Sequence, residues 1–85
     1  MPLLFVPDAL EAIPHNEMDR LKRKIDWLWV NRMVVVHFPM SGDLSNFFKR
    51  RVGNYRIIYT YDKSSDEMVI HLAGLRDSIY QEIRH

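Results

Sequence analysis

Basic side chains gather in one stretch of this sequence. The stretch 44–61 contains four basic residues and no acidic residue, and acidic residues resume at Asp62. The basic residues are Lys49, Arg50, Arg51 and Arg56. The net charge of the whole chain is only +1, so the segregation of charge, rather than its total, indicates a polyanionic partner. Guanidinium groups suit this role because they present two donors in one plane to phosphate oxygens.

The elements that would position these cations are two strands. The runs 46–52 and 55–61 read as strands, and the Gly-Asn dipeptide between them is typical of a hairpin turn. Side chains alternate along a strand, so Tyr55, Ile57, Tyr59 and Tyr61 form the expected core face of the second run. Arg56 then lies on the opposite face. If the turn closes the hairpin, Lys49, Arg51 and Arg56 converge.

The N-terminal half supplies a strand and helices. Leu3 to Val6 reads as a short strand, and Asp8 begins a brief helical turn that Pro14 stops. Asn16 is expected to cap an amphipathic helix that runs to about Asn31. The helix has one basic face, made of Arg20, Lys22, Arg23 and Lys24. That face is either solvated or a contact for a partner or RNA.

The remaining elements complete an α+β domain. Residues 33–38 are read as the end of the helix and an extended loop, 67–73 as a third strand, and 76–84 as a short C-terminal helix. Over residues 1–85 we predict a single domain, in which an N-terminal strand and a helical hairpin pack on a small antiparallel β-sheet. The other face of the sheet is expected to stay uncovered.

Two segments resemble a known family of toxins. The segment 44–59, Leu-Ser-Asn-Phe-Phe-Lys-Arg-Arg-Val-Gly-Asn-Tyr-Arg-Ile-Ile-Tyr, resembles the central hairpin of the RelE/ParE superfamily. The segment 70–80, with its Arg76-x-x-x-Tyr80 element, resembles the closing strand and terminal helix of that superfamily. The resemblance is strongest from Ser41 to Tyr80, and before Ser41 it is one of element pattern.

The resemblance implies a RelE-like toxin of a type II toxin–antitoxin system. Such a toxin is an mRNA interferase, an endoribonuclease that inhibits translation by cleaving messenger RNA on the ribosome without a metal or other cofactor. It implies Arg56, Arg76 and Tyr80 as catalytic residues, with Lys49 and Arg51 binding RNA. It also implies a cognate antitoxin as partner. The alternative on the same scaffold is a ParE-like inhibitor of DNA gyrase with no catalytic activity.

Each proposed site residue also has a structural explanation. In the structural alternative, Arg56 forms a salt bridge with Asp62 or Asp77, Arg76 begins a helix, and Tyr80 packs in the core. His71 is either a general base or a hydrogen-bonded structural histidine. Arg50 departs from the family's apolar residue at its position, so either its side chain reaches the sheet edge or the strand ends early. Leu75 also departs from the family, which often has a polar residue there.

Composition sets further limits. The chain has no cysteine, and its four histidines lack the spacing of a metal site. The first residues lack the features of a signal peptide, and no apolar run is long enough to span a membrane. We therefore expect a cytoplasmic protein. The antitoxin is expected to contact Trp27, Trp29 or the run 33–38, by laying a helix in a groove.

Overall fold

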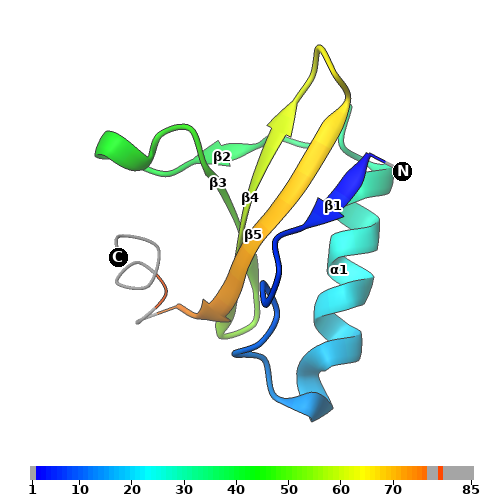
Figure 1. Cartoon of the computed structure of the whole chain (residues 1–85), viewed down its shortest axis with the longest axis vertical. Helices are drawn as coiled ribbons and strands as arrows, with labels where there is room; N and C mark the ends of the chain where they lie inside the picture. Colours follow the sequence, from blue (N-terminus) through cyan, green and yellow to red (C-terminus); the bar gives the residue numbers. More distant parts are fainter. Residues whose placement is uncertain (1, 77–78, 80–85) are drawn as a thin grey trace.

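The computed structural model describes residues 2–76 and residue 79. These residues form a five-stranded sheet with a helix along one face (Figure 1). The strands are β1 (Leu3–Phe5), β2 (Phe38–Pro39), β3 (Phe48–Val52), β4 (Tyr55–Asp62) and β5 (Glu67–Leu75), in the order β1-β5-β4-β3-β2. The predicted α+β class is confirmed. The prediction of a purely antiparallel sheet is wrong, because β1 runs parallel to β5.

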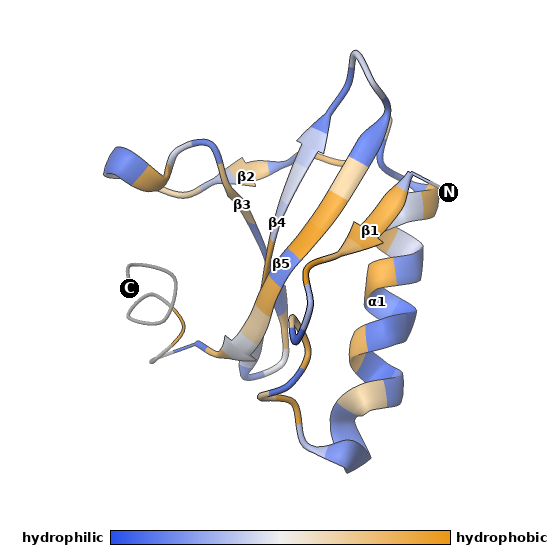
Figure 2. Ribbon diagram, in the orientation of Figure 1, coloured by the Kyte–Doolittle hydropathy of each residue, from blue (hydrophilic) through white to orange (hydrophobic). Residues whose placement is uncertain are grey.

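The helix α1 (Met18–Val30) packs its apolar side on the sheet. Its buried residues Leu21, Ile25 and Leu28 are spaced four and three apart, which puts them on one helix face. They pack against sheet residues that include Ile57, Tyr59, Met68 and Ile70. Figure 2 shows this periodicity as apolar positions recurring along an otherwise hydrophilic helix. No helix in the described part of the chain is long and apolar enough to cross a membrane.

The predicted helical hairpin is wrong, because α1 is the one α-helix among the described residues. Residues 7–12 form consecutive turns, bracketed by Pro7 and Pro14. Asp8 has a φ of 64°, a left-handed conformation that cannot start a right-handed helix. The segment is nevertheless fixed to the sheet, because the carbonyl of Ala9 accepts a hydrogen bond of 2.9 Å from the amide of Ala73.

The start of α1 also differs from the prediction. Asn16 lies inside a short 3-10 helix, η1 (His15–Glu17), and does not cap α1. Glu17 precedes α1 and makes no side-chain capping bond. The end of the helix is closer to the prediction, since the Asn31 side chain donates a 2.8 Å hydrogen bond to the carbonyl of Trp27. The helix is one residue shorter than predicted at each end.

The three predicted strands of the meander are confirmed, with ends that move by one or two residues. The predicted alternation in β4 is confirmed as well, since Ile57 and Tyr59 lie in the core beneath α1 while Ile58 lies on the other face. A register shift follows Ile58, which pairs with Leu72, whereas Tyr59 pairs with Ile70. His71 is thus the extra residue of a β-bulge.

The sheet face opposite α1 is not left uncovered as predicted. Met40, Ile58 and Ile79 form a second small core there, with Leu44, Phe47 and Leu72 packed against it. Part of this cover comes from the segment between β2 and β3, which includes the short 3-10 helix η2 (Gly42–Leu44). Among the described residues, this cover lies over Ile58 and Leu72, away from the β3–β4 turn.

An ion pair fastens the end of α1 to the β4–β5 turn. Arg32 donates two hydrogen bonds to the Asp66 carboxylate, at 2.6 and 2.9 Å. Tyr61 donates a third at 2.7 Å. These donors lower the pKa of Asp66 to about 2, with the Arg32 bond as the largest cause. This network lies at the opposite end of β4 from Arg56.

Candidate nucleic-acid interface

The β3–β4 turn brings two guanidinium groups together. Gly53 has a φ of 59° and Asn54 has a negative φ, as in a type II′ turn with glycine at the first central position. This turn sets Arg51 opposite Arg56 and Lys49 opposite Ile58. Side chains of directly opposed residues share a face, so Lys49, Arg51 and Arg56 converge as predicted. Opposed like charges cost stability, which an anion bound between them would offset.

These three side chains line a pocket of about 280 Å³. Lys24 of α1, Phe38 of β2 and Arg50 complete its lining. Five cations therefore surround the pocket, and none of the described residues that line it is acidic. A pocket of this charge raises the local concentration of phosphate groups. Lys24 and Phe38 were missed by sequence reasoning as members of one site, because neither is near the hairpin in the sequence.

Arg50 lies on the helix side of β3, and its side chain reaches the sheet edge. The strand continues to Val52, so it does not end early. The guanidinium donates a 2.7 Å hydrogen bond to the carbonyl of Val36 and lies 5.5 Å from the Phe38 ring centre. Burial raises the pKa of the Tyr59 phenol, and the nearby Arg50 charge opposes that shift.

Arg76 follows β5 at the same end of the sheet. Its amide donates a 3.0 Å hydrogen bond to the carbonyl of Asn54, in the β3–β4 turn. Two residues earlier, Gly74 is the strand partner of Arg56. Arg76 itself is exposed. The backbone therefore holds Arg76 beside the hairpin that carries Arg51 and Arg56.

His71 is less close to the cations. It lies three residues along β5 from Gly74, or about 10 Å from the Arg56 rung of the sheet. Its Nε2 shares a 3.0 Å hydrogen bond with the Thr60 hydroxyl, and the edge of its ring packs on Phe47 at 5.0 Å between centres. Partial burial lowers the pKa of His71, because desolvation disfavours the charged imidazolium. This geometry favours a structural role.

Asp62 is too far from Arg56 to form an ion pair with it. The two residues are six positions apart along β4, roughly 20 Å, and Asp62 accepts a 2.7 Å hydrogen bond from Ser64. Asp77, Tyr80 and the predicted C-terminal helix 76–84 lie outside the described residues, apart from Arg76, which is in a turn, and Ile79. Within residues 2–76 and 79, no three His, Asp or Glu side chains are grouped as a metal site.

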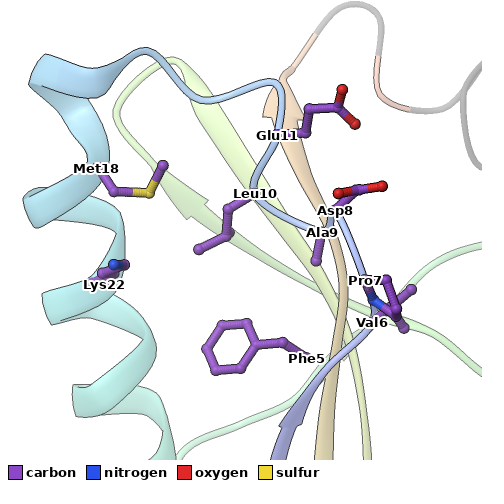
Figure 3. A pocket seen from close by; sticks show the side chains of 9 residues that line it. All are labelled: Phe5, Val6, Pro7, Asp8, Ala9, Leu10, Glu11, Met18 and Lys22. Atoms are coloured by element: carbon purple, nitrogen blue, oxygen red, sulfur yellow. The ribbon is translucent and has the colours of Figure 1, made fainter.

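A second hollow, an open groove of about 540 Å³, lies between the N-terminal segment and α1. Figure 3 shows Phe5 and Leu10 pointing toward the helix, where Met18 and Lys22 face them. Asp8 and Glu11 also line this groove, and Figure 3 shows their carboxylates pointing away from the helix. It shares no residue with the cationic pocket, and its lining is mainly apolar. The groove therefore lacks the charge that phosphate binding needs.

No family model and no curated protein matches the sequence, but solved structures match the fold. The toxin–antitoxin complex RelBE from Mycobacterium tuberculosis contains a chain that aligns with a TM-score of 0.74 at 21% identity, over 87% of this chain and 88% of that one. The isolated E. coli toxin RelE aligns with a TM-score of 0.66 at 17% identity, over 95% and 92%. The chain has the fold of the RelE toxins.

A third structure extends the comparison within the RelE fold. An E. coli YafQ variant aligns with a TM-score of 0.71 at 12% identity, over 92% of this chain and 96% of that one. Each alignment covers about nine-tenths of both chains, so both the helix and the sheet have counterparts in these toxins. At such low identity the RelE fold is shared while side chains have diverged, so the chemistry has to be argued from the pocket itself.

Proposed function

We propose that this chain is the toxin of a type II toxin–antitoxin system, and that it cleaves messenger RNA on the ribosome and so inhibits translation. The observation that carries the proposal is the pocket of five cations in which Arg51 and Arg56 are cross-strand neighbours. The RelE fold adds support, because the proteins that share it are named as toxins. The gyrase inhibitor on the same scaffold has no need for this arrangement of cations.

The chemistry we propose is attack of a ribose 2′-hydroxyl on the adjacent phosphodiester. The bond from the 2′-oxygen to phosphorus forms, the bond from phosphorus to the 5′-oxygen breaks, and the proton that the hydroxyl loses is balanced by one that the leaving 5′-oxygen gains. The negative charge grows on the phosphorane oxygens in the transition state, and preorganised donors aimed at them stabilise it. Arg56 and Arg76 are proposed to hold these oxygens, since each guanidinium can donate two parallel hydrogen bonds. The positive charge of the pocket then does what a metal ion does in other nucleases.

The remaining site residues are proposed to have supporting roles. Lys49 lies two rungs from the Arg51–Arg56 pair, on the same face, and is proposed to hold the flanking phosphate with Arg51. Tyr80 is proposed to orient the nucleotide. The general base is not His71 in this scheme, because its bond to Thr60 and its separation from the arginines keep it away from the hydroxyl. The ribosome is proposed to align the 2′-hydroxyl for attack.

The antitoxin is proposed to cover the end of α1 and the segment that follows it. Val30, Met33, Val34 and Val36 are all exposed apolar residues in this short stretch. Among the described strands β2 forms one edge of the sheet, and it is only two residues long. A contiguous exposed apolar patch beside a sheet edge is typical of a protein interface.

The test is primer extension on cellular messenger RNA after brief induction, with translation running or blocked. Wild type is compared with the Arg56→Ala, Arg76→Ala double variant and with Arg56→Lys, which keeps the charge but loses the planar fork. A Lys22→Ala, Lys63→Ala double variant is the control, because it removes the same charge outside the cationic pocket. Thermal melts of each purified protein establish that it is folded.

We expect new cleavage ends in wild type and in the control, only while translation runs. Arg56→Lys should retain a small part of the cleavage, and the double arginine variant none. Growth arrest without new ends, accompanied by filamentation and DNA damage, would instead assign the chain to the gyrase inhibitors. Cleavage that persists in a folded Arg56→Ala, Arg76→Ala variant would refute the assignment of the site.

A further inference from the structure

The cationic pocket extends from the sheet edge to Lys24 of α1, and its rim carries two aromatic rings: Phe38 of β2, which lines the pocket, and Trp27 of α1, which lies beside Lys24 and Arg50. Phe38 is 50% exposed and Trp27 is 43% exposed. The Arg50 guanidinium lies between them, 5.5 Å from the Phe38 ring centre and 5.9 Å from that of Trp27. Lys24 approaches the Trp27 ring to 4.0 Å. Two exposed rings and two cations thus lie together at one edge of the pocket.

We propose that this rim is a second nucleotide-binding subsite, in which Phe38 stacks on a base of single-stranded RNA while Lys24 and Arg50 hold its phosphates. The inference rests on the proposed function, and it adds the path that the RNA strand follows beyond the site of cleavage. The strand crosses the sheet edge at Phe38 and continues toward Trp27. This second subsite would give the protein affinity for RNA beyond its contacts with the reacting phosphate.

The register of the sheet makes the two subsites continuous. Phe38 is the strand partner of Lys49, and Lys49 is two residues along β3 from Arg51. The two rungs are therefore about 7 Å apart, so a strand that continues past the nucleotides held at the Arg56 site reaches Phe38. No acidic residue interrupts the path among the described residues that line the pocket.

The residue types at the rim suit single-stranded RNA. Proteins that bind single strands combine a cationic groove with aromatic side chains, because every base has a face that stacks and every linkage has a charge. Arg50 is already held by the Val36 carbonyl, so its guanidinium loses little freedom on binding a phosphate.

The experiment compares two uncleavable 2′-O-methyl oligoribonucleotides, a trinucleotide that fills the Arg56 site and a longer strand extended at both ends. Binding is followed by fluorescence anisotropy over a range of salt concentrations. The variants are Phe38→Leu and Lys24→Ala. Their controls are Phe5→Leu and Lys22→Ala, since Phe5 is 46% exposed and both residues line the separate groove beside α1.

We expect Phe38→Leu to weaken binding of the longer strand about 5- to 100-fold, the loss of one base–aromatic stack, and to leave the trinucleotide unchanged. Lys24→Ala should reduce the salt dependence of the longer strand by about one phosphate contact, a change of roughly 0.7 in the logarithmic slope. Both controls should bind like wild type. Arg56→Ala should weaken both probes.

Tryptophan fluorescence gives an independent measurement of the same rim. The chain has two tryptophans, and Trp29 lies under the Arg32 guanidinium, 3.7 Å from ring centre to carbon. In a Trp29→Phe background, Trp27 is the sole emitter. The longer strand should change its emission, and the trinucleotide should not.

The outcomes separate this inference from the proposed function. Binding of both probes that depends on Arg56 but is the same in Phe38→Leu, Lys24→Ala and their controls would overturn the rim subsite and leave the nuclease proposal standing. If wild type bound the two probes with equal affinity, the rim subsite would also be overturned and the nuclease proposal would stand. Absence of binding of either probe to wild type would overturn both.

Discussion

Gly53 carries the turn that opposes Arg51 and Arg56, and replacing it with alanine tests whether the hairpin depends on that one backbone conformation. Its φ of 59° is in the region that L-residues rarely adopt. A Cβ built there would also lie 2.9 Å from Nη2 of Arg20, which is closer than a carbon and a nitrogen normally approach. Gly53→Ala therefore meets two separate obstacles.

The expected cost is about 1–3 kcal/mol of the free energy of unfolding, and nearly all of it comes from the backbone. A non-glycine residue held at positive φ in a constrained turn costs of that order. The contact with Arg20 should add less than about 1 kcal/mol, because Arg20 is the mobile end of an exposed side chain paired with Glu17 at the surface. In a domain of this length 1–3 kcal/mol corresponds to a fall in Tm of roughly 4–20 °C.

The assay is urea unfolding of wild type, Gly53→Ala, Arg20→Ala and the double variant, read as a double-mutant cycle. The coupling energy isolates the contact between residues 53 and 20, and the remainder is the cost of the backbone. Gly42→Ala is the matched control, since Gly42 has a φ of 67° but nothing within 4 Å of its Cβ position. It should lose stability without any coupling to Arg20→Ala.

Two results would refute this reasoning. Gly53→Ala as stable as wild type would mean that the turn does not require positive φ, and the register of Arg51 against Arg56 would then need another explanation. A coupling energy larger than the backbone cost would mean that the close approach of Arg20, rather than the turn conformation, requires glycine. Cleavage by each folded variant should follow the population of the native hairpin.

Three further outcomes are expected. Leu28→Ala, which empties part of the core beneath α1, should cost about 2–5 kcal/mol in urea unfolding, whereas Leu75→Ala at an exposed position should cost under about 1 kcal/mol. The lowered pKa of Asp66 means that its ion pair with Arg32 stabilises the fold above pH 4 and loses this effect as the pH falls toward 2. Asp66→Asn should therefore be less stable than wild type above pH 4, and the two stabilities should converge near pH 2. His71→Gln should leave the cleavage rate within about threefold, and a loss above about 100-fold together with a changed pH–rate profile would make His71 the general base.

The amino-acid sequence by itself determined the elements whose contacts are local. The spacing of Leu21, Ile25 and Leu28 is enough for a helix with one apolar face, because residues three and four apart share a face whatever lies opposite. The Gly53-Asn54 dipeptide between two alternating runs is enough for the hairpin, and with it for the convergence of Lys49, Arg51 and Arg56. The core of the candidate site was therefore readable from residues close together in the chain.

Only the tertiary structure decided the features that join distant residues. The parallel pairing of β1 with β5 joins Leu3 to Met68, and neither strand encodes its partner or its direction. The same holds for Lys24 and Phe38, which enter the pocket because α1 and β2 end beside β3. The cover formed by Met40, Ile58 and Ile79 depends on three separate segments. Alternation along a strand says which side chains share a face, and the rest of the chain decides what covers that face.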